Sequence, residues 1–114
     1  MAKRLMYIEG IDGQVELLTD RVIIHRKGWW NIMRFGFGAK REIPIAAIAE
    51  VVFRDANPIM FGRIEFVRAG RSQDERRKDY SAVKFRKVKQ PEFVKLKEMI
   101  FDMVDQYAKR ETHA

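Results

Sequence analysis

Near the end of this 114-residue chain, residues 91–109 carry apolar side chains at the spacing of an α-helix. The apolar face is formed by Phe93, Leu96, Ile100, Val104 and Tyr107, widened by Val94, Phe101 and Met103. The opposite face is formed by Glu98, Asp102, Asp105 and Lys109, and Lys97 is the one charged residue that falls on the apolar side. Pro91 suits the first helical position. So broad an apolar stripe is stable only against another hydrophobic surface, which the rest of the chain must provide.

Short segments with the period of a β-strand precede this helix. They are residues 5–8, 14–18, 21–26, 40–45, 50–54, 62–68 and 80–86. In residues 62–68, Ile64 and Phe66 point to one face while Arg63, Glu65 and Val67 point to the other. Pro44 either places its strand at a sheet edge or ends the strand there, because proline cannot donate a ladder hydrogen bond. The pattern predicts one mainly β domain over residues 1–114. We expect a barrel or roll of about six or seven antiparallel strands over residues 5–89, closed by a C-terminal amphipathic helix over residues 91–109.

The segment at residues 26–41 fits neither a strand nor a helix, because neither period places its large side chains on one face. Gly28, Gly36 and Gly38 favour a turn or a hairpin tip. The candidate binding residues of this basic aromatic loop are Arg26, Lys27, Trp29, Trp30, Met33, Arg34, Phe35, Phe37, Lys40 and Arg41. Three roles are open for the loop. Its rings seal the mouth of the barrel, pair with a second copy of the chain, or contact a protein partner or an anionic membrane surface.

A second basic stretch follows the last predicted strand and comprises Lys84, Arg86, Lys87 and Lys89. Strand alternation sends Lys84 and Arg86 to one side of the strand, with Val83 and Phe85 directed inward. These cations form either an ordinary solvated face or an electrostatic patch that joins the charges of the basic aromatic loop. Only the second interpretation gives them a role in binding.

Catalytic chemistry finds little support in the sequence. The chain has no cysteine and two histidines, His25 and His113, and no spacing of His and carboxylate residues resembles a zinc or catalytic cluster. Ser72 and Ser81 have no base near them in sequence. We therefore predict that the protein is not an enzyme and needs neither a metal nor another cofactor.

The net charge of +7 biases encounters toward anionic partners such as phospholipid head groups or nucleic acid. No apolar run approaches the length of a membrane span, and the N-terminal residues lack the apolar core of a signal peptide. The expectation is a soluble cytoplasmic protein, with peripheral association at a membrane as an open alternative. Nucleic-acid binding driven by charge is the second functional hypothesis.

The order of these parts resembles the short bacterial pleckstrin-homology-like (PH-like) domains of uncharacterised families. The resemblance spans about residues 10–107 and is carried by residues 13–15, 20–24, 35–38, 40–44, 48–51, 62–66 and 83–85 and by the helix that Phe93 opens. These are patterns of glycine and apolar residues, so they concern the fold and supply no ligand-binding residue. The resemblance implies a binding or scaffolding role, in the form of a protein- or lipid-binding interaction module or one that self-associates through the basic aromatic loop.

Overall fold

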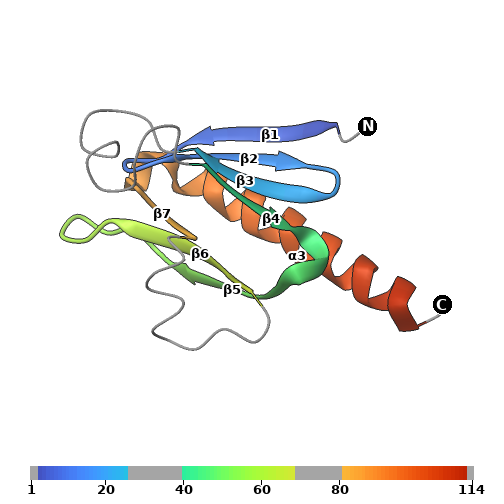
Figure 1. Ribbon diagram of the computed structural model, residues 1–114. Helices are drawn as coiled ribbons and strands as arrows, with labels where there is room; N and C mark the ends of the chain where they lie inside the picture. The colour runs from blue at the N-terminus through green and yellow to red at the C-terminus, as the bar shows by residue number, and fades with distance from the viewer. Residues whose placement is uncertain (1–2, 26–39, 69–80, 113–114) are drawn as a thin grey trace.

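The structure is a computed structural model that describes residues 3–25, 40–68 and 81–112. Within these residues the chain forms seven β-strands, two short 3-10 helices and one long α-helix (Figure 1). In chain order they are β1 (Arg4–Glu9), β2 (Gln14–Leu18), β3 (Arg21–His25), β4 (Lys40–Pro44), η1 (Ile45–Ala47), β5 (Ile48–Arg54), β6 (Gly62–Arg68), β7 (Ala82–Phe85), η2 (Lys87–Lys89) and α3 (Gln90–Thr112). The predicted mainly β fold with a C-terminal helix is confirmed. The basic aromatic loop up to residue 39 and the charged segment 69–80 lie outside the described residues.

The strands form two antiparallel sheets, one in the order β1-β2-β3-β4 and the other in the order β5-β6-β7. Strand β4 lies at an edge of the first sheet and also ends at Pro44, so both expectations for this proline are met. The predicted strand at residues 40–45 ends one residue early, because Ile45 begins η1, although its side chain is fully buried as expected.

Hydrogen bonds join the turn between β1 and β2 to strand β7 of the other sheet. The Ile11 N–H donates to the Lys84 carbonyl at 2.8 Å, and the Lys84 N–H donates to Asp12 Oδ1 at 2.9 Å. Gly10 permits this approach, since a Cβ there would lie only 2.4 Å from Val83 Cγ1. The two sheets therefore enclose one core between them.

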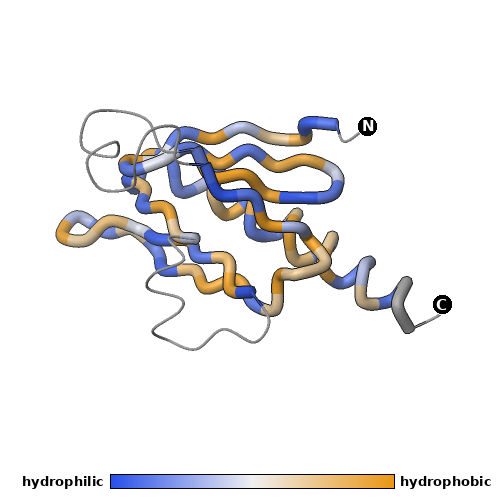
Figure 2. Tube along the Cα trace, in the orientation of Figure 1, coloured by the Kyte–Doolittle hydropathy of each residue, from blue (hydrophilic) through white to orange (hydrophobic). Residues whose placement is uncertain are grey.

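The core is built from the inward-facing positions of both sheets. Figure 2 shows hydrophobic residues along the strands of both sheets and along the helix. Phe85 of β7 stacks on Phe93 of the helix, with ring centroids 4.4 Å apart and planes 11° apart. The ring of Phe53 of β5 also contacts the Phe85 ring, with centroids 5.5 Å apart. The helix is thus held on the sheets by aromatic packing that the sequence pattern had assigned to the core.

Helix α3 begins one residue before the predicted Pro91 and extends to Thr112, beyond the predicted end at Lys109. Its first half supplies the deepest contacts, because Phe93, Leu96 and Ile100 are fully buried. Phe101, which was expected to widen the apolar stripe, is 47% exposed. Lys97, the charged residue on the apolar side, extends its Nζ over the Phe53 ring at 4.6 Å from the centroid. A cation over a ring face is a favourable contact, so this lysine belongs to the packing.

In β6 the two predicted faces are observed, but both carry buried residues. Ile64 and Phe66 face the core, while Glu65 and Val67 on the other face are also buried. The carboxylate of Glu65 lies 3.4 Å from the guanidinium of Arg63. Among the described residues, no helix is both long enough and apolar enough to cross a membrane.

Candidate functional site

Antiparallel pairing gathers several turns at one end of the molecule, which we call the turn end (Figure 1). It contains the β1–β2 turn, the C-terminal end of β3, the N-terminal end of β4, the β5–β6 turn and the link from β7 to α3. The N- and C-terminal ends of the chain lie at the opposite end (Figure 1). Both basic stretches of the sequence therefore meet the turn end, the second through η2 and the first through Lys40, where β4 begins.

A row of three cations crosses the second sheet near the turn end. Arg54 of β5 is the direct cross-strand partner of Arg63 of β6, which is in turn the partner of Lys84 of β7. Direct partners lie on the same face of a sheet, and like charges placed opposite each other destabilise it. Glu65 offsets part of this repulsion through its contact with Arg63. We call Arg54, Arg63 and Lys84 the cation row.

The second basic stretch continues the positive surface beyond the cation row. Lys84 and Arg86 are exposed as alternation predicted, and Lys87 is exposed in η2. Lys89 is half-buried, with its Nζ 3.3 Å from Glu92. Among the described residues, no carboxylate forms an ion pair with Lys84, Arg86 or Lys87.

Of the candidate residues in the basic aromatic loop, Lys40 and Arg41 lie within the described part of the chain. Lys40 is paired with His25 on the outer face of the first sheet, where its Nζ lies 3.8 Å from Glu42. Arg41 is paired with Ile24 and lies on the face that carries the core. The structure thus places these two candidates on opposite faces of β4. The other candidates lie outside the described residues: Arg26, Lys27, Trp29, Trp30, Met33, Arg34, Phe35 and Phe37.

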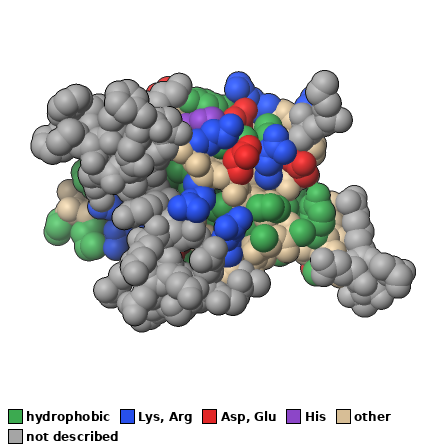
Figure 3. Space-filling model, in the orientation of Figure 1, with side chains coloured by type: hydrophobic (Ala, Val, Ile, Leu, Met, Phe, Trp, Pro, Cys, Tyr) green, Lys and Arg blue, Asp and Glu red, His purple; other side chains and the backbone are tan. Residues whose placement is uncertain are grey.

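An apolar tip at residues 59–61, in the turn between β5 and β6, is exposed although the sequence pattern did not predict it. Ile59 is 94% exposed, Met60 48% and Phe61 47%. In Figure 3 this group appears as hydrophobic side chains at the turn end, next to basic ones. The available signal was a run of three large apolar residues directly after the Asn57-Pro58 turn, where solvent-exposed polar residues are the rule.

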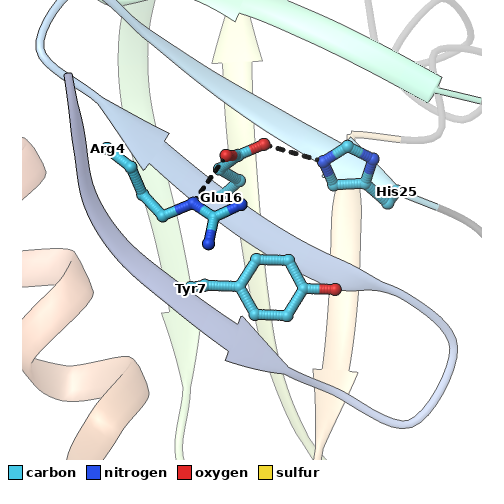
Figure 4. Close-up of a pocket in the computed structure, with 4 residues that line it drawn as sticks. All are labelled: Arg4, Tyr7, Glu16 and His25. Atoms are coloured by element: carbon cyan, nitrogen blue, oxygen red, sulfur yellow. Dashed lines mark hydrogen bonds and ion pairs between the residues drawn. The ribbon is translucent and has the colours of Figure 1, made fainter.

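A polar cluster covers the outer face of the first sheet (Figure 4). The Glu16 carboxylate lies between two partners: Arg4 Nε donates to its Oε2 at 2.8 Å, and His25 Nε2 lies 3.0 Å from its Oε1. The Tyr7 ring completes the cluster, with its centroid 5.2 Å from Arg4 Cζ and 6.4 Å from that of His25. These four side chains line an open cavity of about 240 Å³.

The chemistry of this polar cluster is that of an ion network. Hydrogen bonds from His25 and then from Arg4 hold the pKa of the Glu16 carboxyl below its ordinary value, against a smaller opposing effect of burial. An ionised carboxylate with both oxygens engaged cannot serve as a general acid near neutral pH. The described residues that line the cavity include no serine, threonine, cysteine or lysine nucleophile. Nor do the described residues contain a group of His, Asp and Glu arranged to hold a metal ion.

A smaller cavity of about 200 Å³ lies away from the turn end, between η1 and the second half of α3. Its lining consists of Ile45, Ala46, Ile48, Val104, Tyr107 and Ala108. Among the described residues of this lining, none is an Asp, Glu, Lys, Arg or His.

Comparison with known proteins gives no relative from which a site could be transferred: no family model, no curated protein and no solved structure matches the chain.

Proposed function

We propose that this chain is a PH-like, non-enzymatic interaction module that binds an anionic partner through its turn end. The observation that carries the proposal is the concentration of cations there: the cation row of Arg54, Arg63 and Lys84, continued by Arg86 and Lys87. Seven antiparallel strands in two sheets with a C-terminal helix support the PH-like assignment. Among the described residues, the lining of the polar cluster contains no serine, threonine, cysteine or lysine, which supports a binding role over a catalytic one.

The net charge alone would permit binding anywhere on the surface, but the described cations are not evenly placed. On the outer face of the first sheet, Glu16 and Glu42 lie next to basic side chains and neutralise them in part. Around the cation row, Glu65 is the one carboxylate within ion-pair distance among the described residues. An anionic partner therefore gains most at the turn end.

Nucleic acid is the second candidate partner. It would use the same cations together with aromatic rings on which bases stack. Of the exposed tip residues only Phe61 offers a ring, whereas Ile59 and Met60 are aliphatic. The tip therefore fits a partner with an apolar region better than it fits nucleic acid, whose bases would stack on aromatic rings.

The proposal is tested with the variant Lys84→Gln/Lys87→Gln and a soluble polyanion, heparin, as the probe. The matched control is Lys3→Gln/Lys109→Gln, which removes the same charge from two exposed lysines at the opposite end of the molecule. The turn-end variant is expected to bind heparin at least about threefold more weakly and with a shallower dependence on salt, because fewer counterions are released. The control is expected to bind like the parent.

Equal weakening of both variants would show that net charge alone controls binding, and the assignment of the site would be wrong. A short DNA duplex serves as a second probe in the same titration. Markedly tighter binding to the duplex than to heparin at equal ionic strength would favour the nucleic-acid alternative.

A further inference from the structure

The side chains of the apolar tip at the turn end are exposed to solvent and contribute little to the core. Ile59 has 94% of its surface in water, and Met60 and Phe61 have nearly half of theirs. Val88, in the adjoining link between β7 and α3, is also exposed. Single exposed apolar residues are ordinary, but a contiguous group of this size beside several cations marks an interaction surface.

Hydrogen bonds hold the tip in one conformation. Asn57 Oδ1 accepts from the backbone N–H groups of Ile59 and Met60, each at 2.8 Å, and the Asn57 N–H donates to the Met60 carbonyl at 2.9 Å. On the strand side, Arg54 Nη2 donates to the Phe61 carbonyl at 3.1 Å. A tip that is ordered in advance loses little conformational entropy when it binds.

The base of the tip is fastened to the start of α3. The Ala56 N–H donates to Gln90 Oε1 at 2.7 Å, and Gln90 Nε2 lies 3.4 Å from Asp55 Oδ1. Ala56 itself is buried. The apolar side chains therefore project from a rigid support that also carries the basic link residues.

Charge and shape together identify the occupant of this surface. The tip is a turn that projects from the sheet beyond the cation row, so it fits a soft interface or a pocket rather than another projecting surface. A second copy of this chain would bring its own cations against those of the first, and the repulsion would oppose such docking. A bilayer with acidic head groups suits both parts of this surface. The apolar side chains enter the boundary between head groups and acyl chains, while lysines and arginines contact the phosphate groups.

We propose that the β5–β6 tip inserts Ile59, Met60 and Phe61 into the interface of an anionic lipid bilayer. The cation row, together with Arg86 and Lys87, binds the head groups. This inference rests on the proposed function and adds the class of partner. It differs from general attraction by charge because it requires the apolar side chains.

The test compares the variant Ile59→Ser/Phe61→Ser with the parent in co-sedimentation with large unilamellar vesicles. The vesicles are phosphatidylcholine with or without about 30 mol% phosphatidylserine. The matched control is Phe101→Ser, which removes an equally exposed phenylalanine from α3. The tip variant is expected to bind the anionic vesicles about tenfold or more weakly and to keep its affinity for heparin, whereas the control is expected to bind both like the parent.

Insertion is measured directly with an environment-sensitive fluorophore. Because the chain has no cysteine, Met60→Cys provides a unique labelling site, and Phe101→Cys provides its control. Addition of anionic vesicles is expected to shift the emission of the label at position 60 to shorter wavelength and to leave the label at position 101 unchanged.

Each other result separates the two proposals. If the parent binds heparin but not anionic vesicles, or if the tip variant binds vesicles as well as the parent and the label at position 60 does not respond, insertion is refuted and the anionic interaction module stands. Equal binding to neutral vesicles would refute the role of the cations in lipid binding. If light scattering shows a parent dimer that the tip substitutions convert to a folded monomer, the tip is a self-association surface and the membrane inference is wrong. If the parent binds neither heparin nor vesicles, both proposals fail.

Discussion

Gly62 lies at the start of β6 directly against the ring of Phe85, which makes Gly62→Ala a sharp test of the packing near the turn end. A Cβ at position 62 would lie 2.2 Å from Phe85 Cε2 and 2.4 Å from its Cζ, whereas ordinary contacts begin at 3.4 Å. The ring would have to move by about 1 Å or more. It has no free space to enter, because it is fully buried between Phe93 at 4.4 Å and Phe53 at 5.5 Å.

Two effects oppose each other in this substitution, and their magnitudes decide the outcome. Alanine restricts the unfolded chain more than glycine does, which stabilises the fold by about 0.4–1 kcal/mol where the backbone is compatible. Overpacking a filled core costs about 1–3 kcal/mol. We therefore expect a net loss of about 1–2 kcal/mol in the free energy of unfolding. For a domain of this length that corresponds to a fall in Tm of roughly 4–8 °C.

Thermal and urea unfolding followed by circular dichroism measure this loss, and a double-mutant cycle with Phe85→Leu assigns its cause. Leucine lacks the ring edge that the new Cβ would meet, so the loss in Gly62→Ala/Phe85→Leu should be smaller than the sum of the single losses by about 1 kcal/mol. A Gly62→Ala variant at least as stable as the parent, or strictly additive losses, would refute the steric argument.

Three further predictions concern the polar cluster, the helix and the tip. Glu16→Gln should lower stability at neutral pH by about 1 kcal/mol or less, since solvent screens the ion pairs. The pKa of the Glu16 carboxyl is lowered from 4.5 in the folded protein, so its contribution to stability is fully present above that value and is lost as the pH falls through the lower folded pKa. The unfolding curves of parent and variant should therefore converge in acid. A stability difference that widens in acid would contradict the role of the Glu16 carboxylate. Phe93→Ala should cost about 3–5 kcal/mol, whereas Phe101→Ala on the same helix should stay within about 0.5 kcal/mol of the parent; equal losses in urea unfolding would contradict the burial pattern. Asn57→Ala removes the side-chain acceptor of the tip and should accelerate amide hydrogen exchange at Met60 without lowering Tm by more than a few degrees, and unchanged exchange would show that the asparagine does not hold the turn.

Most of the fold was accessible from the sequence because its signals are local. Alternation identified the faces of β6 and β7, and the helical spacing identified Phe93, Leu96 and Ile100 as core residues. The departures arise where a partner distant in sequence changes the role of a residue. Lys97 appeared out of place until Phe53 supplied a ring beneath its ammonium group, and no spacing within the helix could have shown this.

The candidate site was less accessible, since it depends on which strands become neighbours. Glu16 stands directly across from Tyr7, and its contact with His25 is diagonal, so the polar cluster requires the registers of two strand pairs. The cation row likewise joins three strands. Phe61 and its neighbours were overlooked for a different reason: the apolar residues that follow Asn57 and Pro58 belong to neither the helical nor the strand period.

The two sheets use their outer faces in different ways, and this contrast bears on what the basic charge is for. In the first sheet, Glu42 lies 3.4 Å from Arg21 and 3.8 Å from Lys40, so the cations there contribute to a network within the protein. In the second sheet, Arg54, Arg63 and Lys84 occupy one line, where their mutual repulsion costs stability in the isolated protein. In the proposed function, an anion bound at the turn end offsets this repulsion. This is the physical reason for which we propose the binding surface there and not on the first sheet.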